Sequence, residues 1–427
     1  MKLAWVTPLS AKSAIARVTI PVAQELRERG YEVLLIKSDA DPTVEEIDHK
    51  MSVLSWRSAD PFKIDRDFDC LLVNVGDNYL LHAGIFPFLD YHPLGIFHDY
   101  FLYNLFRGWI ATVENAEAEH HRILSSLYVD ASVESISECW KGLMSLEQIA
   151  SRFPMTEWIA GRCGATLAHA DFYAERLRSA CSGPVASARM GVVPRSPKNV
   201  TRNRPATELR IVTLGVQNRN KCADLVIEAL SNVDRTRCPF QYRLVGPISD
   251  EDRDRLTLAA ARHQVPLSIT GSVDDIQFDE ELEAADLICC LRKPVLEGSS
   301  ASAIEGLMAG KPMIVADAGF YSELPSDILV KVPRDVPVPE LARALVTLMN
   351  DIPLRNRLNL TSQDWARRNF SIFTYTDELE SLIKHAINVR PYSRIARSVG
   401  DQLTGLGVHN HNLVSRIAAT MEGLFGL

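Results

Sequence analysis

The sequence lacks the features by which several common classes of protein are recognised. Its 427 residues carry a net charge of −8, which argues against the basic stripe that a nucleic-acid groove needs. No apolar run reaches the roughly 18–20 residues that spanning a bilayer requires. Pro8 interrupts the opening apolar segment before it reaches the length of a signal peptide. We therefore expect a cytoplasmic protein without a transmembrane segment and without a nucleic-acid partner.

Cysteine and histidine motifs for metals or disulfides are also missing. Eight cysteines are scattered along the chain with no C-x-x-C pair, which favours a reducing compartment over a disulfide framework. The histidines at 120–121 and at 409 and 411 have no further ligands at a suitable spacing, so we predict no metal site. Neither a dinucleotide fingerprint after the first strand nor a G-x-S-x-G nucleophile motif occurs, so a serine hydrolase is not supported.

What the sequence does contain is a repeated alternation of short apolar strands and helical segments. A helix is expected over 14–29, ended by Gly30, and residues 100–150 also favour helices. The strands expected in this first block are KLAWV (2–6), YEVLLI (31–36), CLLVNVGDN (70–78), LGIFHD (94–99) and ATLAHA (165–170). Such alternation is typical of parallel βαβ units.

A second block with the same alternation follows the polar stretch PRSPKNVTRNRPATE (194–208), which is typical of a linker. Its expected strands are LRIVTLG (209–215), FQYRLVG (240–246), LSITG (267–271), ADLICCL (285–291) and PMIVAD (312–317). Its expected helices cover 221–233, 249–263, a segment after Ser299, and then 338–350, 354–368 and 372–389.

These blocks predict an α/β protein with two doubly wound domains facing a central cleft. We assign residues 1–195 to the first domain, 196–208 to a linker and 209–370 to the second domain. Residues 371–427 are expected to form helices and a tail that pack back on the first domain. The apolar stripe of that tail is also compatible with peripheral membrane contact. Open parallel sheets bind ligands outside the carboxyl ends of their strands. We therefore expect the binding residues in the loops that follow strands.

One such loop, EGSSASAIEGLMAGKPMIVAD (297–317), places two glutamates eight residues apart at the start of a helix. Ser299 or Ser300 can cap a helix that begins near Ala301, and its N-terminus suits a phosphate. Glu297 in the loop and Glu305 in the helix could then bind two hydroxyl-bearing groups of one ligand. The alternative is that Glu297 only complements the helix dipole and Glu305 is a solvated helix residue.

The second domain resembles the family 4 type of retaining glycosyltransferases with the GT-B fold. E-G-S-S-A-S-A-I-E resembles the E-x7-E motif of that family, and AGKPMIVADAGFYSELP, which contains Glu323, is similar to its continuation. TLGVQNRNKCADLVIEAL resembles the G-R-x-x-x-x-K-G segment, with Gly215 and Lys221 on matching positions. Val216 stands where the family has an arginine, and Arg219 or Asn218 is expected to substitute for it.

The first domain resembles a subgroup of the same family. PLSAKSAIARVTIPVAQEL is similar to its P-x-x-S-G-I-A loop, with Ser13 in place and an alanine where the glycine is usual. NVGDNYLLHAGIFPFLDYHPLGIFHD is similar to its G-N-x-x-x-H pattern followed by a strand that ends in H-D. Asn78, His82, His98 and Asp99 take the matching positions. His169 ends a further strand, near the position of a family histidine.

The resemblance implies a hexosyltransferase that moves a sugar from a nucleotide-diphosphate donor to a glycan or lipid-linked acceptor, with retention at the anomeric carbon and no divalent ion or cofactor. It implies catalytic roles for His98, Lys221 and Glu297. The donor-binding residues that it implies are Ser13, Asn78, Asp99, Gly215, Arg219, Ser299, Ser300, Ala301 and Glu305. A nucleotide-sugar epimerase of the same fold and a non-catalytic relative that binds a nucleotide sugar or a partner protein remain alternatives.

Overall fold

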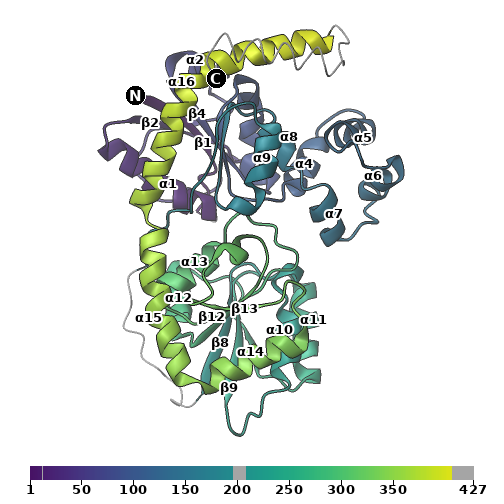
Figure 1. Ribbon diagram of the computed structural model, residues 1–427, viewed down its shortest axis with the longest axis vertical. Coiled ribbons are helices and arrows are strands. Elements are labelled where there is room, and N and C mark those ends of the chain that lie inside the picture. Colours follow the sequence, from purple (N-terminus) through teal and green to yellow (C-terminus); the bar gives the residue numbers. More distant parts are fainter. Residues whose placement is uncertain (12, 196–207, 406–427) are drawn as a thin grey trace.

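The computed structural model describes residues 1–11, 13–195 and 208–405 (Figure 1). The predicted linker, apart from its last residue, and the end of the tail with His409 and His411 therefore lie outside the described residues. The chain forms two α/β domains one above the other, and the last two helices follow one side of the molecule, the first of them beside the second domain and the second beside the first domain (Figure 1).

The first domain is built on a seven-stranded parallel sheet in the order β3-β2-β1-β4-β5-β6-β7. The strands are β1 (Lys2–Thr7), β2 (Glu32–Lys37), β3 (Val53–Ser55), β4 (Cys70–Val75), β5 (Leu94–Phe97), β6 (Ala165–Ala168) and β7 (Val185–Ser187). Most residues of β1, β4, β5 and β6 are buried, because helices cover both faces of the sheet. This explains why these strands are continuous apolar runs rather than alternating ones.

Helices connect these strands, and a helical subdomain extends from the carboxyl side of β5 (Figure 1). The helices are α1 (Ala14–Glu28), α2 (Pro61–Asp67), α3 (Tyr79–His82), η1 (Ala83–Tyr91), α4 (Tyr103–Ile110), α5 (Ala116–Leu127), α6 (Val133–Trp140), α7 (Leu146–Arg152), α8 (Thr156–Ala160), η2 (Asp171–Tyr173) and α9 (Ala174–Ala180). The Ser13 hydroxyl caps α1 by accepting from the Ala16 N–H at 3.3 Å, and Gly30 turns the chain with φ +89°.

The second domain has a six-stranded parallel sheet in the order β10-β9-β8-β11-β12-β13. Its strands are β8 (Leu209–Leu214), β9 (Phe240–Val245), β10 (Leu267–Ile269), β11 (Leu287–Cys290), β12 (Met313–Ala316) and β13 (Val330–Val332). Its helices are η3 (Arg219–Lys221), α10 (Ala223–Leu230), α11 (Asp250–Arg262), α12 (Asp275–Ala284), α13 (Ala301–Met308), η4 (Gly319–Glu323), α14 (Val338–Asn350) and α15 (Ile352–Asn369).

Both sheets reverse their direction of winding next to the first strand, between β1 and β4 in one domain and between β8 and β11 in the other. The predicted class of two doubly wound domains is thus confirmed, and these two switch points are where such sheets bind ligands. The carboxyl ends of both sheets lie at the junction between the domains.

The last helix, α16 (Ile372–Gly405), joins the second domain back to the first. It packs on α1, β4 and β6, with Leu379 and Ile383 fully buried against them. Arg390 and Arg394 lie on either side of Pro391 and both pair with Asp65, the latter at 2.6 Å. The sequence predicts a helix only as far as residue 389, because proline interrupts helical hydrogen bonding. The ion pairs with Asp65 and the packing on the first domain stabilise the helix, which continues beyond Pro391.

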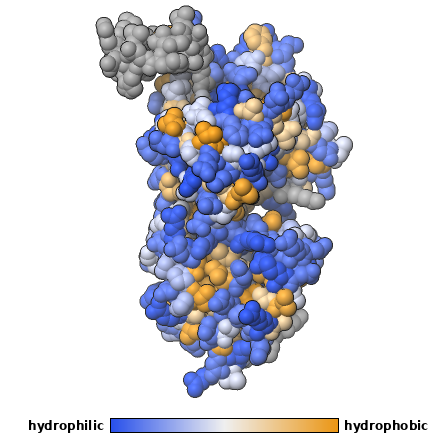
Figure 2. All heavy atoms as spheres, turned by 90° about the vertical axis from the view of Figure 1, so that its right-hand side faces the viewer, coloured by the Kyte–Doolittle hydropathy of each residue, from blue (hydrophilic) through white to orange (hydrophobic). Residues whose placement is uncertain are grey.

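The surface of the molecule is mostly hydrophilic on the face drawn in Figure 2, with apolar side chains singly or in small groups. No helix within the described residues is both long and apolar enough to cross a membrane.

Beneath the surface, one cluster of buried side chains includes Val75 and Phe97 of the first domain together with Val212 and Phe320 of the second. The two domains therefore share a continuous core at their junction.

Candidate functional site

Loops that follow strands in the two domains are hydrogen-bonded to each other. The Leu296 carbonyl accepts from the backbone N–H groups of Tyr100 and Phe101 at 3.0 and 2.9 Å. The Gly298 N–H donates to the His98 carbonyl at 2.9 Å, so that Asp99 and Glu297 form an antiparallel bridge. The loop after β5 and the loop after β11 are therefore held together as two short strands.

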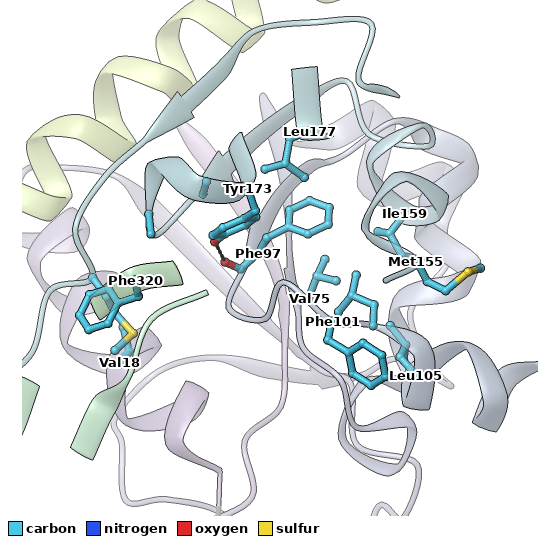
Figure 3. Close-up of a cluster of buried hydrophobic side chains, with 14 of the residues drawn as sticks. Val18, Val75, Phe97, Phe101, Leu105, Met155, Ile159, Tyr173, Leu177 and Phe320 are labelled. Atoms are coloured by element: carbon cyan, nitrogen blue, oxygen red, sulfur yellow. Dashed lines mark hydrogen bonds between the residues drawn. The ribbon is translucent and has the colours of Figure 1, made fainter. Parts of the chain in front are cut away.

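Tyr173 lies directly beneath this contact. Its buried hydroxyl donates to the Phe97 carbonyl at 2.7 Å, the dashed line in Figure 3, and accepts from the His169 N–H at 2.7 Å. A Cβ atom on Gly298 would lie 2.5 Å from the Tyr173 hydroxyl and 3.0 Å from the His98 carbonyl. Only glycine therefore allows the two loops to approach so closely.

Side chains add further bonds between the domains. The Glu323 carboxylate accepts from the backbone N–H groups of Asp171 and Phe172, at 3.0 and 2.7 Å. Arg17 of α1 pairs with Asp275 of α12 at 2.5 Å. Glu323 belongs to the segment that resembles the glycosyltransferase family, and here its carboxylate caps η2 of the opposite domain.

The loop after β8 holds Lys221 with its amine inside the protein. Lys221 is 6% exposed, and its Nζ donates to the Leu214 carbonyl. A Cβ on Gly215, which has φ +85°, would lie 2.8 Å from that Nζ. Burial lowers the pKa of Lys221 to about 7, and the Arg292 guanidinium lowers it as well, whereas Glu297 acts in the opposite direction.

The tip of α13 lies in the same region. The Ser300 hydroxyl accepts from the Ala303 N–H at 3.4 Å and lies 3.8 Å from the Cys290 thiol at the end of β11. The first N–H groups of a helix have no intrahelical partner, and the helix dipole makes this end positive. The hydroxyl of Ser299 is buried and has no hydrogen-bond partner among the described residues.

Arg292, which the sequence analysis did not single out, is the closest partner of Glu297. Its Nε lies 2.6 Å from Glu297 Oε1, and the Tyr321 hydroxyl donates to the same oxygen at 2.8 Å. Burial alone would raise the pKa of Glu297, but the Arg292 guanidinium holds it below its ordinary value. Glu297 is therefore an ionised carboxylate in the interior, paired with Arg292, rather than only a partner of the helix dipole.

Glu305 is also largely buried, but it faces a different side chain. Arg195, just before the linker, places its Nε 2.9 Å from Glu305 Oε1 and its Nη1 2.6 Å from Asp279. Burial raises the pKa of Glu305, and Arg195 opposes that shift. The structure thus places both glutamates inside the protein, each with its own arginine, and the hypothesis that Glu305 is a solvated helix residue is wrong.

In the first domain, His98 belongs to a buried polar network. Its Nε2 lies 3.2 Å from Asn74 Oδ1, and the Asn74 amide nitrogen lies 2.8 and 2.7 Å from the hydroxyls of Thr7 and Thr19. Because the amide nitrogen donates to the hydroxyls, Oδ1 is left to accept, so Nε2 of His98 carries the proton. Burial and the adjacent His169 keep the pKa of His98 well below its ordinary value. His98 is therefore a neutral imidazole with Nδ1 as acceptor.

Asp99 lies one residue further along, beside Gly76 and His82. A Cβ on Gly76 would meet His82 Nε2 at 2.7 Å and an Asp99 carboxylate oxygen at 3.2 Å. That oxygen accepts from the Asp77 N–H at 2.8 Å. Burial raises the pKa of Asp99 to about 7; the Asp77 N–H lowers it, and Glu297 raises it. Asp77 itself accepts from backbone N–H groups at the start of α4, so it has a structural role.

Three predicted donor-binding side chains have local partners of their own. Arg219 is 70% exposed and pairs with Glu251 at 2.9 Å, so it does not join Lys221. Asn78 is exposed and caps α3 through the Leu80 N–H, at 3.0 Å. Ser13 is buried as the cap of α1. Local helix capping and a nearby acidic helix account for these positions, and family spacing alone does not reveal such competing partners.

Neither of two cavities in the described structure lies at this junction. One, of about 380 Å³, lies at the amino ends of β11 and β12 beside Asp286 and Lys311. The other, of about 30 Å³, lies between the amino ends of β4–β6 and α16. Across the described ranges no group of three or more His, Cys, Asp or Glu side chains is placed to hold a metal ion.

The second domain matches a known protein family. Residues 197–365 match the family model described as glycosyl transferases group 1. The chain carries a glycosyl transferases group 1 domain. This match confirms the resemblance for the second domain, whereas the retention of configuration stays a prediction. No curated protein sequence matches the chain.

Solved structures similar to the whole chain are glycosyltransferase-fold proteins of low sequence identity. A sucrose-phosphate synthase from Thermosynechococcus elongatus aligns with a TM-score of 0.63 at 13% identity, over 90% of this chain and 98% of that one. HepE from Anabaena, in complex with UDP and glucose, has a TM-score of 0.61 at 15% identity, with 90% and 99% covered. WaaG, a glycosyltransferase involved in lipopolysaccharide biosynthesis, aligns with a TM-score of 0.58 at 13% sequence identity. The alignment covers 91% of this chain and 99% of WaaG. These similarities show a shared fold that includes the first domain.

Proposed function

We propose that this protein is a retaining glycosyltransferase of the hexosyltransferase type. It moves a sugar from a nucleotide-diphosphate donor to a hydroxyl acceptor in glycan or polysaccharide assembly. The observation that supports this most is the convergence of Lys221, Glu297 and the tip of α13 beside the switch point between β8 and β11. The group 1 domain and the similarity to HepE make UDP-sugars the first donors to test.

Lys221 and the N-terminus of α13 would hold the diphosphate. When the bond between the anomeric carbon and the diphosphate oxygen breaks, the electron pair stays on the diphosphate and its charge grows. A preorganised ammonium and helix N–H groups stabilise that charge most in the transition state, and such electrostatic stabilisation is usually the largest catalytic effect. These groups supply positive charge without a divalent ion, so we propose a metal-independent reaction that persists in a chelator.

The remaining residues would position the sugar and the nucleotide. Glu297, fixed by Arg292 and Tyr321, would accept hydrogen bonds from donor-sugar hydroxyls. Neutral His98, held by Asn74, would accept from the sugar through Nδ1. Glu305 would bind ribose hydroxyls, which requires that the nucleotide displace Arg195 from that carboxylate. Domain contact through the loops at 98–101 and 296–298 would then exclude water from the reacting sugar.

Calorimetry of the full chain with UDP-, GDP- and ADP-sugars, followed by NMR of the products, tests this proposal. One donor should bind, and its sugar should be transferred or slowly hydrolysed with retention. Lys221→Gln should abolish turnover, whereas Lys141→Gln, which changes an exposed lysine, should not. An epimerase would instead convert the donor sugar, and a partner-binding relative would neither bind nor hydrolyse any donor. Either result would contradict the proposal.

A further inference from the structure

Arg292 is a buried arginine beside the proposed diphosphate site. It lies two residues after the end of β11, at the carboxyl end of the sheet, and only 7% of it is exposed. Its loop touches the Lys221 loop, because the Lys293 N–H donates to the Asn220 carbonyl at 2.8 Å. Arg292 and Lys221 are therefore neighbours across the switch point between β8 and β11.

The contacts of Arg292 leave part of its guanidinium unused. Nε forms a salt bridge with Glu297 Oε1 at 2.6 Å, and Nη1 donates a hydrogen bond to the Leu291 carbonyl at 2.7 Å. Nη2 makes no hydrogen bond to the part of the chain that the structure describes. Glu297 is one carboxylate facing two basic side chains, Arg292 and Lys221. Two neighbouring cations with a single anion favour the binding of a further negative group.

Among the described residues, the loop after β8 supplies no second positive side chain beside Lys221. Val216, which stands where related sequences have an arginine, is 59% exposed and apolar. Arg219 points to the surface and binds Glu251. The unpartnered, buried hydroxyl of Ser299, in the same loop as Glu297, is a second and independent sign that a ligand completes this site.

We propose that Arg292 is a diphosphate-binding residue that replaces the missing arginine of the β8 loop. This inference rests on the proposed function. The planar guanidinium would hold Glu297 through Nε and donate from Nη2 to a phosphate oxygen at the same time. A lysine ammonium cannot make both contacts in this fixed geometry. Lys221 and Arg292 would then approach the diphosphate from two sides of the switch point. The arginine and lysine of the G-R-x-x-x-x-K-G segment would thus have equivalents here. Lys221 lies in the loop after β8, and the arginine comes from the loop after β11.

A purely structural role is the competing explanation, in which Arg292 only neutralises Glu297. The two explanations differ in which part of the ligand is affected. A phosphate contact is lost only for ligands that carry the diphosphate, whereas a collapsed site weakens the nucleoside as well. Uridine and UDP, which differ only in the diphosphate, are therefore suitable probes.

The test compares wild type, Arg292→Gln, Arg292→Lys and the control Arg219→Gln as full-length chains. UDP binding is measured by calorimetry, uridine binding by ligand-observed NMR, and folding by thermal unfolding. A lost hydrogen bond to a charged group is worth about 1.5–3 kcal/mol, so Arg292→Gln should weaken UDP roughly 10- to 150-fold. Uridine affinity should change less than about twofold. Arg292→Lys should recover part of the UDP affinity, and Arg219→Gln should bind like wild type.

Two results would overturn the inference while leaving the proposed function intact. One is unchanged UDP affinity in Arg292→Gln. The other is an equal loss of UDP and uridine in both Arg292 variants, which indicates a structural role. If Arg292→Gln does not fold, the UDP-to-uridine ratio of Arg292→Lys decides between these outcomes. If wild type binds neither UDP nor any other nucleoside diphosphate, the proposed function fails together with the inference.

Discussion

At the scale of single residues, the site depends on charged groups held inside the protein. Lys221 is the clearest case, since burial and Arg292 bring its pKa down to about 7. Above that pH the free protein increasingly carries a neutral amine. A bound diphosphate favours the ammonium form, so binding above pH 7 must take up a proton.

The affinity for a UDP-sugar should therefore fall as the pH rises from 7 to 9, by at most about tenfold per pH unit for one proton. A UDP-sugar is preferred to UDP because it has no terminal phosphate that titrates near neutral pH. Calorimetry across this range provides the measurement. Lys221→Arg, which stays protonated throughout, should bind with little pH dependence. An equal slope in both proteins would show that another group titrates.

Tyr173 provides a residue-scale prediction about stability. Its hydroxyl bonds both Phe97 and His169 at 2.7 Å in the interior, so Tyr173→Phe leaves a buried carbonyl and a buried N–H unpaired. The free energy of unfolding should fall by about 1–3 kcal/mol in urea titrations. Tyr79→Phe is the control, because its hydroxyl makes no hydrogen bond to a described residue. Equal effects in the two variants would refute the role given to Tyr173.

Residues that follow strands could be predicted from the sequence, whereas their partners could not. Lys221 and Glu297 were found because they lie in loops after apolar runs and match family motifs. Arg292 was missed because LRKP is typical of an exposed loop. Its only sequence signal is a basic residue directly after a buried strand. The pairing of Glu305 with Arg195 joins residues 110 positions apart, and no spacing rule indicates it.

At the scale of elements, long apolar strands and well-capped helices were predictable, and short or tertiary-supported ones were not. The runs that became β1, β4, β8 and β12 are continuous and buried, so their pattern is strong. The edge strands β3, β7 and β13 have three residues each and carry no such pattern. The expected strand at 94–99 ends at Phe97, because Asp99 pairs with Glu297 of the second domain instead.

The packing of α16 leads to a prediction at this scale. Leu379 and Ile383 are fully buried against the first domain, so replacing either with alanine should cost about 2–5 kcal/mol of unfolding free energy. Phe373 lies on the same helix but is 63% exposed, and Phe373→Ala should change stability by less than about 0.5 kcal/mol. Urea titrations compare the three variants. Similar losses in all of them would mean that α16 contributes through helix formation rather than packing.

At the scale of the whole molecule, the two domains are held in contact by backbone bonds between two loops, by side-chain bonds such as Glu323 to η2 and Arg17 to Asp275, and by shared apolar packing. Gly298 permits their close approach, since any Cβ there would collide with Tyr173 and the His98 carbonyl. Gly298→Ala should therefore separate the loops at 98–101 and 296–298 without unfolding either domain. Small-angle scattering should report a larger radius of gyration with an unchanged circular dichroism spectrum.

Gly400→Ala is the matched control, because its added Cβ would have no atom within 4 Å apart from its chain neighbours and the backbone of its own helix turn. Its scattering curve should superimpose on that of wild type. Unchanged dimensions in Gly298→Ala would indicate that the loops shift locally and that this contact does not set the arrangement of the domains.

The central claim is that a nucleoside diphosphate is held between Lys221, Arg292 and the tip of α13. A crystal structure of the full chain with UDP tests this claim most directly. We predict the diphosphate within hydrogen-bond distance of Lys221 Nζ, Arg292 Nη2 and the first N–H groups of α13, with the ribose at Glu305 and Arg195 displaced. UDP bound elsewhere, or with its phosphates turned away from both basic side chains, would contradict the account.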